Sequence, residues 1–298
     1  MKNCMPLLLL AACAAPAAPR AARIEPASRA PYAFDVADPA ASSIVVRIDA
    51  APSDAALEAV RVLVAPDSWS RGALFVEGKQ LVVRNTPGAC ERVKELLAAL
   101  SAQEKDMVAV TARFLKLSRE QLSDLRNLEP TNGSLAGLFD REALADVVAG
   151  WMKEGAQIIS APRCTAFHGQ NAHITIASQT AYIQGHERQV CTGGATDLDP
   201  VIGILNEGLS LKVVAVRADN RLQLAASIEL SALLPVKVID VRFEGRVVQL
   251  PAATRVSAEQ RVSMAGGQSL LLVVRNPDSR DPAHPLVAVV IDASELFD

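Results

Sequence analysis

Aromatic residues are scarce in this chain of 298 residues, where phenylalanine, tryptophan and tyrosine together make up 4%. A pocket lined by aromatic rings, or a platform on which bases stack, needs more of them. A basic excess is also absent, because 30 Lys and Arg stand against 33 Asp and Glu, for a formal charge of -3. After the N-terminus no apolar run approaches the ~20 residues of a membrane-spanning helix. These absences exclude a nucleic-acid partner and a helical membrane protein.

Signature motifs of catalysis are missing as well. The chain has no Gly-x-Ser-x-Gly nucleophile turn, no His-Glu-x-x-His motif and no P-loop. Gly193-Gly194 and Gly266-Gly267 read as turn glycines rather than phosphate cradles. The sequence therefore predicts a protein that is not an enzyme, with no catalytic residues and no cofactor.

Cysteine is too rare for a complete disulfide framework, since only three cysteines lie beyond the N-terminal leader. Cys164 and Cys191 flank a predicted strand pair and form a candidate disulfide in an oxidising compartment. Cys90 falls in a predicted helix, where a small buried apolar residue is expected.

Three of the four histidines lie close together in the sequence, at His168, His173 and His186, near Cys164 and Cys191. A hairpin predicted between His168 and His173 would bring these two side chains together. The spacing matches no familiar zinc pattern, and solvated histidines at a hairpin end are the simpler interpretation. The sequence predicts no metal site, and a metal-binding envelope protein remains an alternative.

The N-terminus is typical of an exported protein. Residues 1–12 read as a short signal peptide, and 13–42, rich in Ala, Pro and Arg, read as a flexible tether. Leu10-Ala-Ala-Cys13 resembles a bacterial lipobox, which implies a lipid on Cys13. Ala14 stands where an Asp would imply retention at the inner membrane, so the resemblance favours a lipid anchor in the outer membrane, on its periplasmic side. The alternative is an Ala-rich disordered leader that happens to contain Cys13.

Residues 43–103 have the pattern of a small βαββα unit. A first helix is expected to start at Ser53 or Asp54, either of which can cap it. A second helix is expected after Thr86-Pro87, which supplies a cap and a first-turn proline. Pro66–Arg71 is expected to be a loop. Strands are expected at Ile44–Ile48, Ala73–Val76 and Gln80–Arg84, the last two joined at Gly78-Lys79.

Residues 104–298 form a second, β-rich domain with a helical insertion at about 116–155. Met107–Leu115 alternates as a long strand, and Asp140–Lys153 reads as a helix. From Ile158 onward the chain is nearly all strand and turn. Hairpins are expected at Gly169-Gln170, Asp219-Asn220 and Gly266-Gly267. The fold class is therefore α+β.

Several motifs occur in the order in which they occur in bacterial secretins, and the chain resembles that family. Ala55–Leu100 resembles a secretin N-domain. Ile159-Ser-Ala-Pro-Arg163 with Gly169-Gln170, Gly203–Val213, and finally Val248–Pro251 with Ala265–Leu271 resemble the secretin core. The chain departs from the family in having room for one N-domain only, and in the loop that follows Val274.

The resemblance implies a non-enzymatic subunit of an outer-membrane ring that serves protein secretion or pilus export in type II or type III systems. Its expected partners are further copies of itself, other secretion-system envelope proteins and the outer membrane. The alternative is a periplasmic lipoprotein scaffold or binding module derived from a secretin, without pore activity. Strand alternation over Arg221–Ser231 fits both, because a half-buried soluble strand alternates as a membrane strand does.

Overall fold

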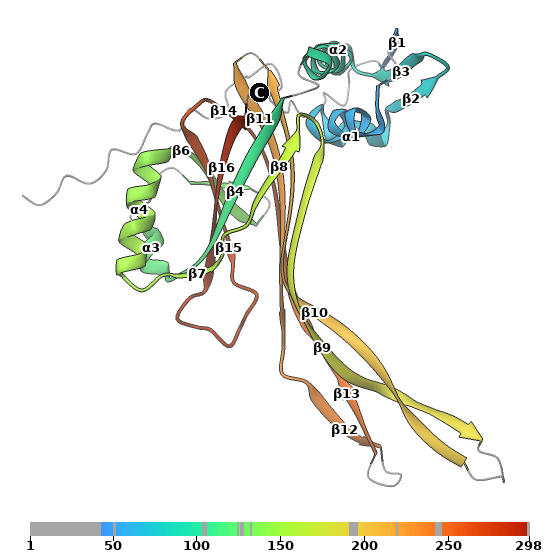
Figure 1. The fold of residues 1–298 in the computed structure, drawn as a ribbon, viewed down its shortest axis with the longest axis vertical. Coiled ribbons are helices and arrows are strands. Elements are labelled where there is room, and N and C mark those ends of the chain that lie inside the picture. The colour runs from blue at the N-terminus through green and yellow to red at the C-terminus, as the bar shows by residue number, and fades with distance from the viewer. Residues whose placement is uncertain are drawn as a thin grey trace, which may run out of the picture.

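The computed structural model describes residues 43–49, 52–102, 106–123, 125, 128–131, 133–190, 196–218, 220–241 and 246–296. Strands dominate and a few helices accompany them, which confirms the predicted α+β class (Figure 1). The elements in chain order are β1 (Ile44–Ile48), α1 (Asp54–Leu63), the 3-10 helix η1 (Pro66–Ser70), β2 (Ala73–Glu77), β3 (Gln80–Asn85), α2 (Pro87–Ala102), β4 (Met107–Leu117), α3 (Arg119–Ser123), β5 (Glu129–Thr131), β6 (Ser134–Asp140), α4 (Arg141–Lys153), β7 (Gln157–Ser160), β8 (Arg163–Phe167), β9 (Asn171–Val190), β10 (Thr196–Ala218), β11 (Arg221–Leu233), β12 (Lys237–Val241), β13 (Arg246–Leu250), β14 (Ala253–Met264), β15 (Gln268–Arg275) and β16 (Leu286–Leu296).

The N-terminal elements form a small layer of their own. Strands β1, β3 and β2 pair in that order as an antiparallel sheet, and α1 and α2 cover one face of it. The Ser53 hydroxyl accepts a hydrogen bond from the Ala56 N–H at 3.2 Å, which caps α1. The Thr86 hydroxyl accepts one from the Ala89 N–H at 3.4 Å and caps α2 in the same way.

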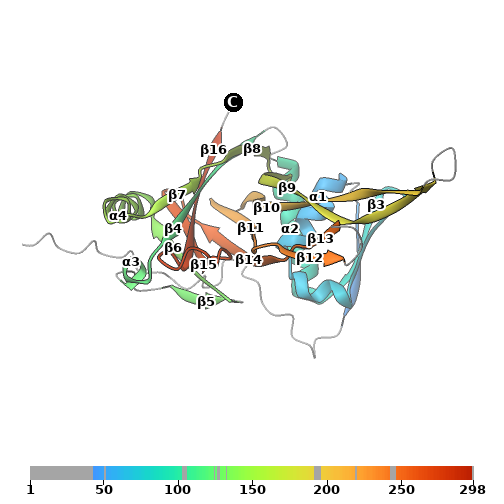
Figure 2. The same cartoon turned by 90° about the horizontal axis from the view of Figure 1, so that it is seen from below.

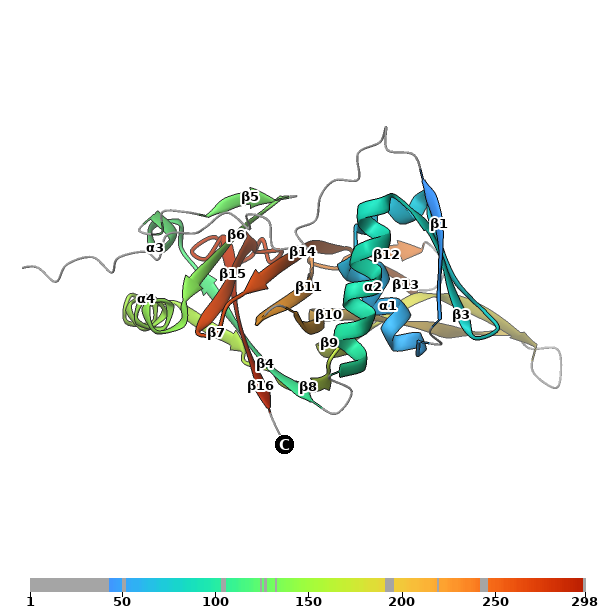
Figure 3. The ribbon, with the colours of Figure 1, turned by 90° about the horizontal axis from the view of Figure 1, so that it is seen from above.

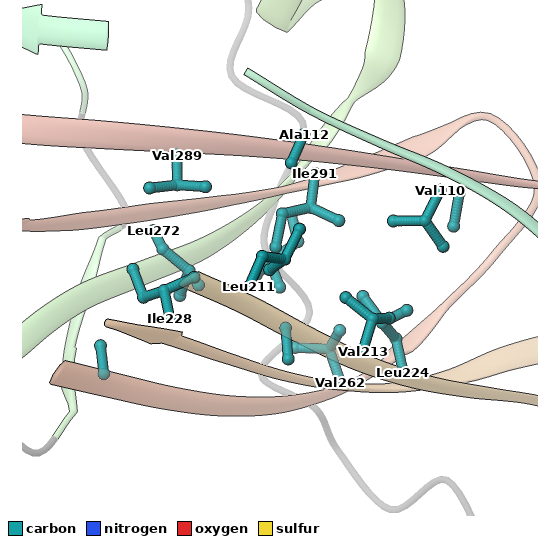
Figure 4. Packing of buried hydrophobic residues seen from close by; sticks show 14 of the residues in the cluster. Val110, Ala112, Leu211, Val213, Leu224, Ile228, Val262, Leu272, Val289 and Ile291 are labelled. Atoms are coloured by element: carbon teal, nitrogen blue, oxygen red, sulfur yellow. The ribbon is translucent and has the colours of Figure 1, made fainter. Parts of the chain in front are cut away.

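Two larger sheets pack face to face, and the N-terminal layer packs on one of them. A four-stranded sheet has the order β14-β11-β10-β9, and a seven-stranded sheet has the order β5-β6-β15-β16-β4-β7, with β8 also paired to β4. Val213, Leu224, Leu272 and Ile291 interdigitate between the two sheets (Figure 4). The alternation predicted for β11 is confirmed, because its even-numbered residues from Leu222 to Leu230 lie in this core.

Helices cover both outer faces of the sandwich. α4 packs on the seven-stranded sheet, where Leu144, Val148 and Trp151 are buried. α1 and α2 pack on the four-stranded sheet against Val214 and Val216 of β10. Seen from the end, the layers run from α3 and α4 through the two sheets and the α1–α2 pair to the three-stranded sheet (Figures 2 and 3).

A long arm extends from the sandwich (Figure 1). Residues 178–190 of β9 pair with residues 196–207 of β10, beyond the last β10 residue that has a partner on β11. The β12–β13 hairpin leaves the end of β11 after Pro235 and lies beside this pair. We call residues 178–190, 196–207 and the β12–β13 hairpin the arm.

Two hairpins predicted from glycine turns are wrong. Across Gly169, β8 pairs with β4 in one sheet whereas β9 pairs with β10 in the other. Across Gly266-Gly267, β14 pairs with β11 whereas β15 pairs with β6 and β16. Both turns thus carry the chain from one sheet to the other across the sandwich. A tight glycine turn can join two strands that pair as a hairpin or two strands that belong to different sheets. The flanking strands have the same apolar pattern in both cases, so the sequence does not distinguish them.

Two expectations about local structure also need correction. The insertion at 116–155 is not all helical, because β6 lies inside the seven-stranded sheet and forms a short hairpin with β5 at Gly133. The interval predicted as a loop at Pro66–Arg71 contains η1. The Trp69 indole N–H donates to the Val64 carbonyl at 2.8 Å and holds this turn against α1. Within the described ranges, none of the helices combines the length and apolar character needed to cross a membrane.

Candidate assembly surface

The four-stranded sheet ends on one side at β9 and on the other at β14, and in the described part of the chain neither strand has a second partner. An edge strand offers unpaired N–H and C=O groups to any other strand. The four strands alternate in direction, so β9 and β14 run antiparallel to each other. A second copy placed beside the first, with its β9 next to β14, therefore continues the antiparallel pattern without interruption.

The unpaired backbone groups of β9 can be assigned from two hydrogen bonds. The Ile183 N–H donates to Gln249 Oε1 at 2.7 Å, so it points away from β10. The Gly208 N–H of β10 donates to Ser231 Oγ of β11 at 3.2 Å, which fits the same alternation. Along a regular antiparallel strand every second residue points its N–H to the same side. Between the start of β9 and Ile183, the N–H groups that point away from β10 are therefore those of His173, Thr175, Ala177, Gln179 and Ala181.

The edge formed by β9 carries little that discourages pairing. Its first 16 residues, 171–186, contain no proline and no Asp, Glu, Lys or Arg. Charged side chains, prolines and short length are the usual protection of an exposed edge. The other edge, β14, has alternating charges, with Arg255 paired to Glu229 at 2.9 Å and Arg261 to Glu259 at 3.7 Å. Neither edge has a proline within the strand.

The arm exposes apolar side chains from both of its hairpins. Ile202 and Ile204 of β10 are 55% and 62% exposed, and Val238 of β12 is 59% exposed. Ile239, Leu250 and, at the base of the arm, Ile176 add to this surface. Apolar side chains gathered in this way mark a surface that another surface covers.

The base of the arm is built around Gly208. This residue has φ +147°, and a Cβ atom there would lie 2.1 Å from the Ile176 carbonyl oxygen. Beside it, Glu207 accepts a hydrogen bond from the Leu233 N–H at 3.0 Å, at the point where β11 ends. Arg280 of the β15–β16 loop lies 3.9 Å from the Glu207 carboxylate. These contacts join the arm, the four-stranded sheet and the loop at one place.

The N-terminal layer has an exposed apolar face too. Val45 of β1 and Phe75 of β2 are 61% and 48% exposed. They lie on the three-stranded sheet, whose other face packs on α1 and α2.

The histidines predicted to cluster are separated by the fold. His168 is buried, and its Nδ1 accepts a hydrogen bond from the Arg217 N–H at 3.1 Å. His173 is exposed on β9 and contacts the hydroxyls of Ser210 and Thr175 at 2.9 and 3.0 Å. His186 stands thirteen residues further along the same continuous strand, which at ~3.3 Å per residue is about 40 Å away. Three His, Cys, Asp or Glu side chains placed to hold a metal ion are not found in the described part of the chain.

The cysteine predictions are resolved in part. Cys90 is fully buried in α2, as expected of a small apolar residue, and burial raises the pKa of its thiol. Cys164 is partly buried on β8, and burial raises the pKa of its thiol as well. Cys13 and Cys191 lie outside the described residues, so the lipid anchor and the Cys164–Cys191 disulfide stay predictions.

Sequence reasoning did not find the arm or the two sheet edges. The uncharged stretch 171–186 is a signal for an unprotected edge, but it has that meaning only once the pairing of β9 is known. The exposed isoleucines of the arm look in the sequence like the core positions of any strand.

No protein-family profile matches the chain. No curated protein matches it. Secretin structures are among the solved structures that are similar to it. The type IV competence pilus secretin PilQ of V. cholerae is 15% identical, with a TM-score of 0.31 over 86% of this chain and 77% of that one. The InvG secretin-domain β-barrel of the Salmonella SPI-1 injectisome is 12% identical, with a TM-score of 0.32 over 87% of this chain and 89% of that one.

The type II secretion system secretin GspD of E. coli K12 is 13% identical, with a TM-score of 0.30 over 85% of this chain and 63% of that one. The chain is thus similar to structures of the family that its motifs resemble. Identities and TM-scores of this size transfer no individual position from those proteins to this chain.

Proposed function

We propose that this protein is a non-enzymatic subunit of a homo-oligomeric envelope ring of the secretin kind, which takes part in protein secretion or pilus export. Copies assemble head to tail, with the β9 edge of each copy paired to the β14 edge of the next. The observation that carries the proposal is the four-stranded antiparallel sheet with two open, proline-free and antiparallel edges. A head-to-tail interface that closes makes a ring, and closure removes every edge strand.

The arms support the same arrangement. All copies in a ring have the same orientation relative to its axis, so their arms project in one direction. The exposed isoleucines of β10 in one copy then lie near the arms of its neighbours. Their apolar surface is then covered by other copies of the chain, which gains free energy roughly in proportion to the area removed from water. The exposed face that holds Val45 and Phe75 offers a second contact between copies at the level of the N-terminal layer.

Export and anchoring belong to this proposal as well. The signal peptide at 1–12 and a lipid on Cys13 place the ring at the periplasmic side of the outer membrane, held by the tether 13–42. Other envelope proteins of the same secretion machine are its further partners. Domain boundaries at 43–103 and 104–298 separate a ring-building N-domain from the β-rich domain that carries the two edges.

Proline substitution of β9 tests the assembly directly. Thr175 and Gln179 point their N–H groups outward, so the double variant T175P/Q179P removes two donors from the free edge and none from the ladder with β10. We expect this variant to remain folded and to lose the oligomer. The matched control T175A/Q179A removes the same side chains but keeps both N–H groups, and is expected to assemble like the unsubstituted protein.

The measurement is light scattering on the full-length chain, extracted from bacterial membranes in mild detergent, with electron micrographs of the same fractions. An unsubstituted protein that is monomeric contradicts the proposal, and so does a proline variant that still forms rings. Conductance across planar bilayers then separates a pore-forming ring from the scaffold without pore activity.

A further inference from the structure

A cleft opens between the two large sheets at the end of the sandwich opposite the arm. Its volume is about 310 Å3, and it lies where the β10–β11 turn, the β14–β15 turn, the start of α4 and the end of β16 meet. Three arginines from three different elements line it, namely Arg141, Arg217 and Arg221. The one carboxylate among the described lining residues is that of Glu295.

Arg221 lines the cleft with a positive charge that is not balanced by a carboxylate of the described residues. Its Nε donates to Ser263 Oγ at 2.9 Å and its Nη2 to the Ser263 carbonyl at 2.7 Å. Both partners are neutral, and no carboxylate among the described residues forms an ion pair with it. These two bonds fix the guanidinium plane at the rim of the cleft without neutralising it.

Arg141 is neutralised only in part. Its Nη2 donates to the Ala293 carbonyl at 2.8 Å, whereas its Nε is buried and has no hydrogen-bond partner among the described groups. The nearest carboxylate oxygen to that Nε is on Asp292, at 3.7 Å. The same carboxylate also pairs with Arg113 at 3.1 Å and accepts a hydrogen bond from the Ser269 hydroxyl. Asp292 is thus shared among several donors, so it neutralises Arg141 only in part, and the side chain of Arg141 is 39% exposed.

Further donors complete the lining. Arg217 pairs with Glu295 at 3.0 Å. This ion pair neutralises the Glu295 carboxylate, so the cleft has little attraction for a cation. Gly266 and Gly267 form the β14–β15 turn, and their N–H groups donate to no atom in the described part of the chain. The Gly267 carbonyl accepts from the Arg141 N–H at 2.8 Å, which holds the start of α4 against that turn.

From this set of donors we infer that the cleft binds a phosphate group. Arginine forks match the oxygens of phosphate in planar, two-bond geometry, and their charge is weakly hydrated. Donors that reach the cleft from three elements suit a group with three terminal oxygens. The cleft is large enough for a phosphate attached to a small organic moiety. The phosphate arrives either as a free anion or as a phosphorylated lipid headgroup, and the inference is independent of ring assembly.

The test is calorimetric titration of the full-length detergent-extracted protein with inorganic phosphate, at constant ionic strength set with chloride. R221Q is expected to weaken phosphate binding at least tenfold. R221K keeps the charge and the aliphatic stem but loses the fork, and is expected to weaken binding severalfold. R84Q, which removes an exposed arginine from β3 far from the cleft, is the matched control and is expected to bind as the unsubstituted protein does.

Circular dichroism melting of each variant shows whether it is folded, and R221K provides a folded variant should R221Q not fold. Absence of phosphate binding in the unsubstituted protein overturns the inference, as does an equal loss in R84Q and R221K. Flotation with phosphatidylcholine vesicles that contain phosphatidic acid distinguishes the sources. Flotation that inorganic phosphate displaces and R221K weakens supports the headgroup, whereas binding of inorganic phosphate without flotation supports the free anion.

Discussion

At the scale of single residues, His168 links the two large parts of the chain. It follows β8, its Nδ1 accepts the Arg217 N–H, and the next residue, Gly169, lies against Leu100 of α2. Burial lowers the pKa of His168, the nearby Asp106 charge raises it, and Arg217 lowers it, with burial the largest effect. The folded protein therefore holds this imidazole neutral, and a protonated Nδ1 has no lone pair for the Arg217 N–H.

This depressed pKa makes stability depend on pH in a definite direction. Since the unfolded chain binds a proton near pH 6.5 and the folded chain only at lower pH, stability is lost as pH falls below about 6.5. We expect H168Q, whose side-chain oxygen can still accept the Arg217 N–H, to lose less stability between pH 7.5 and pH 5. Urea unfolding at both pH values measures this, with H173Q, on the exposed face of β9, as the control. An H168Q protein with the same pH dependence as the unsubstituted chain would show that His168 is not the titrating group.

At the scale of elements, local signals predicted which segments are strands better than which strands pair. The caps at Ser53 and Thr86 start α1 and α2 where the sequence placed them, because a cap acts within one turn of the chain. The helix predicted from Asp140 begins one residue later, and Asp140 is its cap. The turns at Gly169 and Gly266-Gly267 were predicted as hairpins and instead cross between sheets. A positive φ at a glycine permits a sharp turn, but the choice of partner depends on strands far away in the sequence.

Gly208 shows how much one backbone position matters for an element. We expect G208A to weaken the β9–β10 pairing at the base of the arm by ~2 kcal/mol or more, because the added Cβ meets the Ile176 carbonyl and φ +147° strains any other residue. Hydrogen exchange measured by mass spectrometry should accelerate over residues 172–180. G185A is the matched control on the same hairpin, since a Cβ there has nothing within 4 Å. Equal exchange in both variants would contradict the role assigned to Gly208.

At the scale of the whole molecule, the sequence predicted two units but not the surface between them. Residues 43–103 and 104–298 were predicted as two domains, and the polar residues of β11 on the face opposite its apolar residues. In the structure the second face of the four-stranded sheet is covered, so Ala225 packs under α1 and α2, and Gln223 is buried with its amide on Ser263 Oγ. A single strand's alternation shows that one face is buried but not whether the other face meets water or another unit.

This covered face makes a prediction about cooperativity. Val216 of β10 is fully buried beneath the N-terminal layer, in the same cluster as Leu63 and Leu96. We expect V216D to destabilise the protein by about 3 kcal/mol or more, because it buries a carboxylate without a partner. V238D makes the same chemical change on the arm. With both variants made in the T175P/Q179P background, which is expected not to assemble, V238D should leave the free energy of unfolding within about 0.5 kcal/mol of that background. Urea unfolding followed by the fluorescence of Trp69 and Trp151, which lie in the N-terminal layer and in α4, reports on both units at once. If the two units are coupled through this face, V216D lowers the midpoint for both tryptophans, whereas a loss confined to one of them would mean that the units unfold independently.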